Sequence, residues 1–208
     1  GHEGAKIYLV EPDTSEQVKS RVVADLGEIN MGDPVTLRDF VDYGASEYPA
    51  YNQALVLWNH GSGWKALEEE RTDVTKDVCF DDTDRDSLTT EELSAIMPDL
   101  AYSCDGIELL GFDACLMQMF GVGYEFYEGV GVIAASEETE PGDGWNYEGL
   151  IGALVLNSGM IPEELGNAIV ESYASFYSGW SEITISAINA QSLPYVAEAL
   201  YGFSMVLT

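Results

Sequence analysis

GIELLGFDACLM, residues 106 to 117, begins as a run of apolar, strand-forming residues and halts at Gly111. Asp113, Ala114 and Cys115 come next, and a helix-like spacing of apolar residues follows them. The stretch predicts an α/β fold in which Cys115 lies at the carboxyl end of a buried strand and in the first turn of a helix. Open α/β sheets bind ligands at this edge, and a helix N-terminus stabilises a thiolate through its dipole and free N–H groups. Cys115 is therefore a candidate nucleophile.

A second apolar run, ALVLWNHGSGW at residues 54 to 64, passes through Asn59 and His60 into a glycine-rich end. If the two strands are neighbours in a parallel sheet, His60 and Cys115 face each other, which is the pairing that nucleophilic acyl transfer needs. The alternative is structural, with a small buried thiol and a hydrogen-bonded histidine. Only one other histidine exists, His2, near a start that reads as a tail. This scarcity favours the catalytic interpretation of His60.

The backbone N–H groups of Gly61 and Cys115 are candidate donors to an oxyanion, because a glycine after the histidine lets the backbone approach a substrate closely. Asn59 has two open roles, orienting His60 or capping the strand end.

Three motifs together carry a resemblance to a known family: NHGSGW, GFDACLM and ASEETEPGDGWNY, in that order, with DLGEINMGDPVTLRDFV near the start. They resemble the clostripain family of cysteine peptidases, relatives of caspases, legumains and gingipains, from about Lys6 to the end. The resemblance implies a caspase-like α/β/α sandwich with a mostly parallel central sheet. It also implies a His60/Cys115 dyad that cleaves peptide bonds after Arg or Lys.

Further expectations come with this family. Asp113 and Asp143 are expected to line the pocket for the basic side chain, and self-cleavage is expected in the loop at about 65–86. Lys76 is the preferred site, ahead of Arg71 and Lys65. The family usually begins with a further strand and helix, and the resemblance starts after that point.

The chain is expected to form one peptidase domain over residues 6–208, after a tail or cloning remnant over residues 1–5. KIYLV at residues 6–10 is predicted to be a strand of the central sheet. Capping and periodicity signals predict the other elements: helices over 34–47, from Thr89 onward, 162–177 and 193–206, strands at 131–136 and 183–190, and an exposed loop at 65–86.

Charge is the unusual property of the composition. There are 37 acidic and 8 basic residues, a formal net charge of -29. Such a chain repels nucleic acid and anionic membranes and attracts basic ligands, so the expected partners are polypeptides with basic residues. The excess suggests a saline or cation-rich external setting, or simply an acidic surface. No membrane span or signal peptide is present in these residues, and we expect a secreted or cell-surface protein that acts as a monomer.

No cofactor is expected to be required for the chemistry, while the family resemblance leaves calcium open. Asp82, Asp84 and Asp86 alternate as in an EF-hand, but Ser87 and Leu93 stand where that loop needs a glycine and a bidentate carboxylate. The motif therefore reads as a solvated acidic turn.

The three cysteines leave at least one without an intrachain partner. Cys115 is the natural free thiol. Cys79 and Cys104 are interpreted as two reduced, buried thiols, with a disulfide between them as the alternative.

Two other functions fit the same residues. A catalytically silent acidic module could bind cations and serve adhesion on this fold. A transpeptidase could use the same dyad, because sequence does not separate hydrolysis from transfer to an amine.

Overall fold

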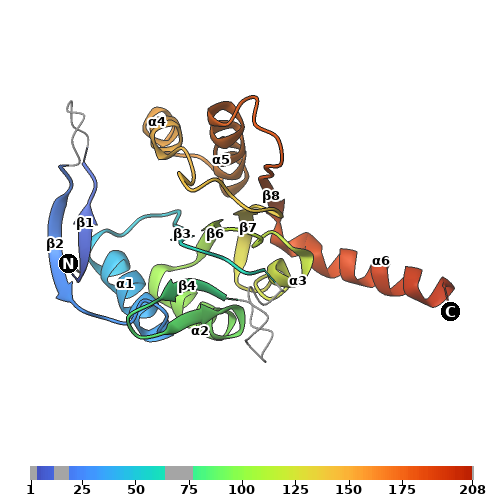
Figure 1. Cartoon of the computed structure of the whole chain (residues 1–208), viewed down its shortest axis with the longest axis horizontal. Helices are drawn as coiled ribbons and strands as arrows, with labels where there is room; N and C mark the ends of the chain where they lie inside the picture. The colour runs from blue at the N-terminus through green and yellow to red at the C-terminus, as the bar shows by residue number, and fades with distance from the viewer. Residues whose placement is uncertain (1–3, 12–18, 64–76, 208) are drawn as a thin grey trace.

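The computed structural model of the chain describes residues 4–11, 19–63 and 77–207 (Figure 1). The strands are β1 (Ala5–Leu9), β2 (Arg21–Gly27), β3 (Ala54–Trp58), β4 (Asp77–Asp81), β5 (Asp86–Thr89), β6 (Ile107–Asp113), β7 (Val130–Ala135) and β8 (Ser186–Asn189). The helices are α1 (Pro34–Glu47), α2 (Thr90–Cys104), α3 (Phe120–Gly123), α4 (Tyr147–Leu156), α5 (Pro162–Phe176) and α6 (Leu193–Val206), with a 3₁₀ turn η1 (Ala190–Ser192).

The central sheet has the strand order β3-β6-β7-β8. The first three strands are parallel, and β8 pairs with β7 in the antiparallel sense. In β6 all residues but Glu108 are buried, as expected for a strand covered on both faces. The mostly parallel central sheet that the family resemblance implied is confirmed.

Helices cover both faces of this sheet, giving three layers (Figure 1). On one side α1, α2 and α3 pack on a core that includes Leu110, Phe112 and Ile133. On the other side α4 and α5 pack on Leu109 and Val132. Because neighbouring residues of one strand point to opposite faces, both helical layers pack against side chains of the same strands. This α/β/α sandwich confirms the predicted fold class.

Local capping signals explain where two helices begin. The Asp33 side chain accepts the N–H of Val35 at 2.8 Å, and Pro34 opens α1. Thr89 and Glu92 form a reciprocal capping box at the start of α2. Both helices therefore start where the sequence predicted them.

The sheet predicted for KIYLV and the length predicted for the loop at 65–86 are wrong. KIYLV does not join the central sheet, because among the described residues β1 pairs with β2 alone, in a separate antiparallel two-stranded sheet whose residues are at most half-buried. The predicted loop at 65–86 is shorter, because β4 and β5 form a second hairpin over its last ten residues and the strand after it. Lys65 to Lys76 lie outside the described residues.

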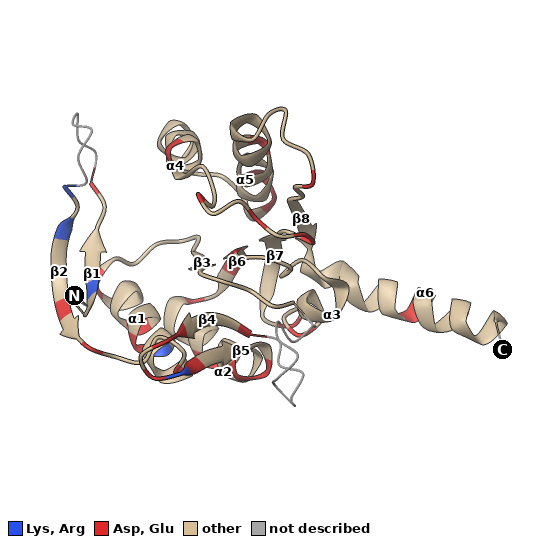
Figure 2. Ribbon diagram, in the orientation of Figure 1, with Lys and Arg blue, Asp and Glu red and all other residues tan. Residues whose placement is uncertain are grey.

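The cysteines are unpaired, and the last helix is almost uncharged. Cys79, Cys104 and Cys115 are free thiols, as interpreted from the sequence. Asp and Glu lie on most elements, whereas α6 carries a single charged residue, Glu198 (Figure 2). None of the helices in the described ranges combines the length and apolar character that crossing a bilayer requires.

Candidate active site

The register of two parallel strands brings His60 and Cys115 to the same edge. Trp58 at the end of β3 pairs with Asp113 at the end of β6. His60 comes two residues after Trp58, and Cys115 comes two residues after Asp113. The arrangement that the sequence required, two neighbouring parallel strands with these residues beyond their carboxyl ends, is therefore present.

Two glycines let the segments after these strands meet closely. A Cβ at Gly61 would overlap the Cys115 carbonyl oxygen and lie 2.9 Å from Cγ of Met117. A Cβ at Gly63 would lie 2.7 Å from the Leu116 carbonyl oxygen. Real Cβ atoms do not approach this closely, so the histidine segment can pack against the cysteine segment only where it has no side chain of its own. The HGSG pattern thus has a packing role.

The segment that holds Cys115 is a turn and not a helix. Helix α3 begins only at Phe120 and has four residues. Leu116 adopts a left-handed conformation with φ 66°, and its N–H donates to the Glu138 carbonyl oxygen at 3.0 Å. The prediction that Cys115 lies in the first turn of a helix is wrong, because these hydrogen bonds to the end of β7 hold the chain in a turn. The Cys115 Sγ atom instead accepts the backbone N–H of Glu140 at 3.3 Å.

Asn59 bonds to backbone atoms. Its Nδ2 donates to the Phe80 carbonyl oxygen at 3.4 Å, and its Oδ1 accepts the His60 backbone N–H. Neither bond reaches the imidazole ring. Asn59 therefore fixes the strand end and joins it to β4.

A pocket of ≈ 440 Å³ opens between the two segments. Its lining comes from the ends of β3 and β6, from the β4–β5 hairpin and from the segment after β7: Trp58, Asn59, His60, Phe80, Asp82, Asp113, Ala114, Cys115, Glu140, Pro141, Gly142 and Gly144. His60, Cys115 and Asp113 are thus brought together in one concave site, which is where ligands bind in open α/β sheets.

Asp113 is almost completely buried in this pocket. It is 2% exposed, and its Oδ2 atom accepts the Tyr147 hydroxyl at 2.8 Å and the Trp145 N–H at 3.1 Å. Gly144 leaves the carboxyl group its space, because a Cβ there would lie 2.8 Å from Oδ2. Gly144 also has φ +66°, which disfavours other residues.

Glu140 is the second carboxyl group of the pocket. Its Oε1 accepts the Trp145 Nε1–H at 3.4 Å, while its Oε2 is buried with no hydrogen-bond partner among the described residues. Burial, followed by the hydrogen bond and the charge of Asp113, raises the pKa of Glu140 to about 9. Burial and then nearby Asp113 also raise the pKa of Tyr147, so that it stays a neutral donor.

Asp143 lies beside the pocket and not in its lining. It is exposed, between Gly142 and the buried Gly144. The Gly61 and Cys115 N–H groups donate to no residue in the described ranges. The cleavage candidates Lys65, Arg71 and Lys76 lie outside those ranges.

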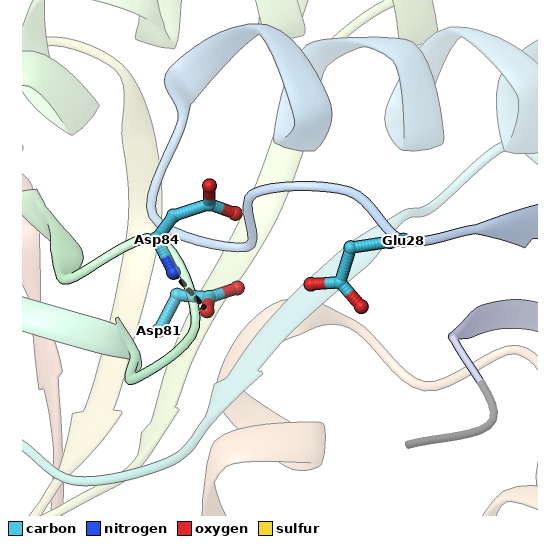
Figure 3. A group of neighbouring side chains, drawn as sticks. All are labelled: Glu28, Asp81 and Asp84. Carbon is cyan, nitrogen blue, oxygen red and sulfur yellow. Dashed lines mark hydrogen bonds between the residues drawn. The ribbon is translucent and has the colours of Figure 1, made fainter.

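The carboxylates that could hold one cation are Glu28, Asp81 and Asp84, whose oxygens lie within 4.8 Å of one another (Figure 3). They form one such group among the described residues, and none of the three lines the pocket. Asp81 already accepts backbone N–H groups, from Thr83 at 2.8 Å and from Met31 at 3.0 Å. These bonds account for its position as a turn residue.

Glu140 was not among the predicted site residues, although it lies in the quoted motif ASEETEPGDGWNY. A usable signal existed, because Glu140 follows the third parallel strand as His60 and Cys115 follow the first two. Burial distinguishes it from its neighbours, since Glu137 and Glu138 are exposed.

An α/β/α sandwich with a histidine and a cysteine beyond adjacent parallel strands is the architecture of the caspase-like cysteine peptidases. This chain belongs to the clostripain family, whose model matches residues 5–205. It is 32% identical over 148 residues to clostripain of Hathewaya histolytica, covering 66% of this chain and 27% of that protein.

Solved structures agree with the fold. A secreted C11 cysteine protease of Bacteroides thetaiotaomicron bound to an irreversible peptide inhibitor is 24% identical, with a TM-score of 0.71, over 93% of this chain and 55% of that one. An inactive zymogen C11 protease of Parabacteroides distasonis is 21% identical, with a TM-score of 0.62, over 92% and 49%. The chain thus spans about half the length of these structures.

Proposed function

We propose that this chain forms the catalytic part of a secreted cysteine endopeptidase that cleaves after Arg or Lys. The observation that carries the proposal is the pairing of Trp58 with Asp113, which sets His60 and Cys115 on one pocket. Membership of the clostripain family supports the same chemistry.

In the proposed reaction the Cys115 sulfur attacks the carbonyl carbon of the scissile peptide bond. His60 takes up the thiol proton and gives it to the leaving amine, so that the bond breaks and a thioester to Cys115 remains. Water then attacks the thioester and releases the carboxylic acid and the thiol. The unengaged N–H groups of Gly61 and Cys115 are suited to stabilise the oxyanion.

The basic specificity is proposed to come from the carboxyl groups in the pocket. Asp113 lines it directly, and a carboxylate pairs well with a guanidinium or ammonium group. Asp143 is exposed beside the pocket, and its contribution is a separate prediction tested below. The net charge of -29 favours the approach of basic polypeptides and disfavours nucleic acid.

The test is hydrolysis of short peptide amides with Arg, Lys or a neutral residue before the scissile bond. The intact protein should cleave the basic substrates, and Cys115→Ala should abolish cleavage while remaining folded by circular dichroism. Full activity in Cys115→Ala would refute the mechanism. Added amine nucleophiles distinguish hydrolysis from transfer, because a transpeptidase would give the amide of the added amine. Failure of wild-type Cys115 to react with a peptidyl electrophile would favour a silent cation-binding module.

A further inference from the structure

The pocket beside Cys115 contains two carboxyl groups in contact with each other. Asp113 and Glu140 line the same pocket and accept hydrogen bonds from the same residue, Trp145, through its backbone N–H and its indole N–H, and their carboxyl groups interact with each other. Asp113 lies at the end of β6 and Glu140 lies in the segment after β7, and 27 positions separate them in the sequence. The contact is tertiary and specific to the folded chain.

These carboxyl groups are buried without a counter-charge. No Lys or Arg is among the residues that line the pocket in the described part of the chain. Asp113 is 2% exposed, and the Oε2 atom of Glu140 is buried and receives no N–H or O–H donor from the described residues. Two ionised carboxylates accept hydrogen bonds and cannot donate one to each other. A proton must therefore lie between them while the pocket is empty.

The surroundings assign that proton to Glu140. Asp113 already accepts two hydrogen bonds on one oxygen, from the Tyr147 hydroxyl and the Trp145 N–H. Glu140 receives a single long bond from the Trp145 indole. The raised pKa of Glu140 agrees with this assignment.

We propose that Glu140 is a specificity-determining residue that releases its proton to solvent when an arginine side chain of the substrate enters the pocket. The inference rests on the proposed peptidase function and goes beyond it, because it makes the specificity depend on pH. The O–H bond of Glu140 breaks, its proton passes to water, and the guanidinium takes its place beside the two carboxylates. No other bond changes.

Arginine fits this pair better than lysine. A guanidinium has a planar fork of N–H donors that can engage two carboxylates, whereas an ammonium is a compact point charge. Arginine also stays protonated at every pH used below. The ligand therefore brings a constant charge, and any pH dependence of its recognition belongs to the protein.

Several groups that titrate or carry charge surround Glu140. They are Asp113 at the end of β6, Cys115 after it, Tyr147 in α4, Tyr173 in α5 and Tyr177 just after α5. Asp143, from the same segment as Glu140, acts on Tyr177. His60 and Asp82 line the same pocket. Burial raises the pKa of Tyr147, Tyr173 and Tyr177, so these three remain neutral. His60 and Cys115 act on every substrate, so the experiment compares two substrates that differ only in the charge entering the pocket.

The experiment measures kcat/KM for two peptide amides that differ only in arginine or citrulline before the scissile bond. Citrulline is neutral and nearly the same shape, so any effect of pH on the bond-breaking steps is common to both substrates and cancels in the ratio. For the wild type the arginine-to-citrulline ratio should rise with pH, by up to about tenfold per pH unit between pH 6 and 8, as the competent ionised pocket becomes more populated. For Glu140→Gln the ratio should be flat, because the amide has no proton to release.

Glu137→Gln is the matched control. It removes an exposed carboxylate from the same segment, and its ratio should rise with pH as in the wild type. Calorimetry gives a second readout: N-acetyl-arginine amide titrated into Cys115→Ala at pH 7, in buffers of different ionisation enthalpy, should release close to one proton. The double variant with Glu140→Gln should release none.

The outcomes separate this inference from the proposed function. Cleavage after arginine with a ratio that does not change with pH in the wild type would overturn the proton exchange and leave the peptidase intact. A rising ratio that persists in Glu140→Gln would assign the proton elsewhere and also overturn it. Equal cleavage of both substrates at every pH would remove the basic specificity, and the inference with it.

Discussion

The backbone N–H of Glu140 donates to the Cys115 sulfur at 3.3 Å, while the side chain of the same residue contacts Asp113. One residue after β7 therefore touches both the candidate nucleophile and the candidate specificity carboxylate. The three parallel strand ends, at His60, Cys115 and Glu140, converge on one pocket.

Glu140→Gln should change the pH dependence of stability. The pKa of Glu140 is about 9 in the fold against 4.5 in its ordinary state. The contribution of Glu140 to the free energy of unfolding is fully present below pH 4.5 and is lost as pH rises through 9. The loss occurs because unfolding lets the buried group release its proton, which a higher pH favours. The variant should lose this slope, which is at most about 1.4 kcal/mol per pH unit for one proton.

Urea unfolding at several pH values between 5 and 9 measures this effect. The free energy of unfolding of Glu140→Gln should exceed that of the wild type increasingly toward pH 9, with Glu137→Gln following the wild type. Parallel curves for wild type and Glu140→Gln would show that Glu140 is not held protonated.

Gly61→Ala should reduce activity through packing. The new Cβ would overlap the Cys115 carbonyl oxygen, so the histidine and cysteine segments must separate. A displacement near 1 Å at reacting groups costs about 100-fold in rate. Gly152→Ala is the control, since nothing lies within 4 Å of a Cβ there. Comparable kcat/KM values for the two variants would contradict the close approach.

Asp113→Asn should reduce the preference for arginine over a neutral residue more than Asp143→Ala does. Asp113 is 2% exposed inside the pocket, whereas Asp143 is exposed beside it and screened by water. Exposed ion pairs contribute about 0 to 1 kcal/mol, or up to roughly fivefold in the preference for arginine over a neutral residue. We expect Asp143→Ala to stay within that limit and Asp113→Asn to exceed it clearly. An Asp143→Ala effect as large as that of Asp113→Asn would show that the loop closes onto the substrate.

Calcium at millimolar concentration should raise the melting temperature by a few degrees over a chelator, with magnesium inactive. Glu28 and Asp84 are exposed and Asp81 is half-buried, so any binding at this group is in the weak, millimolar class. Asp84→Asn should reduce the shift, and Asp99→Asn, an exposed control outside the group, should not. Equal melting temperatures in calcium and chelator would end this expectation.

Self-cleavage between β3 and β4 should give two fragments that join at Lys76, with Cys115→Ala remaining a single chain by intact mass. Asp77 directly follows this site, is 2% exposed, and donates its N–H to the Ser62 hydroxyl at 2.8 Å. The bond after Lys76 is therefore cut only when this contact opens, and we expect the step to be slower than cleavage of a free peptide. Unchanged mass in both proteins would contradict self-cleavage, and cutting in both would indicate a contaminating protease.

Local signals in the sequence predicted much of the fold. The cap at Asp33 and the capping box at Thr89 act within one helical turn, so α1 and α2 begin as expected. The apolar runs of β3, β6 and β7 needed no knowledge of distant contacts. Their parallel pairing was the condition on which the His60 and Cys115 hypothesis rested, and the family resemblance implied it.

Tertiary contacts explain what the sequence could not predict. The residues after Cys115 have helical spacing, but Leu116 and Gln118 donate to the carbonyl oxygens of Glu138 and Ser136. KIYLV has strand character, yet nothing local specifies which sheet it joins. Glu140 is one of several neighbouring acids, and only the folded chain reveals its burial against Asp113.

The burial of Cys79 and Cys104 also affects how active sites can be titrated with a thiol reagent. Cys104 is 5% exposed, and its sulfur donates to the carbonyl oxygens of Leu100 and Gly106. Burial raises the pKa of Cys79 to about 11, so almost none of it is thiolate near neutral pH. Alkylation of the native protein should therefore stop at one equivalent, on Cys115, which turns a thiol reagent into an active-site titrant giving the molar fraction of competent enzyme in any preparation.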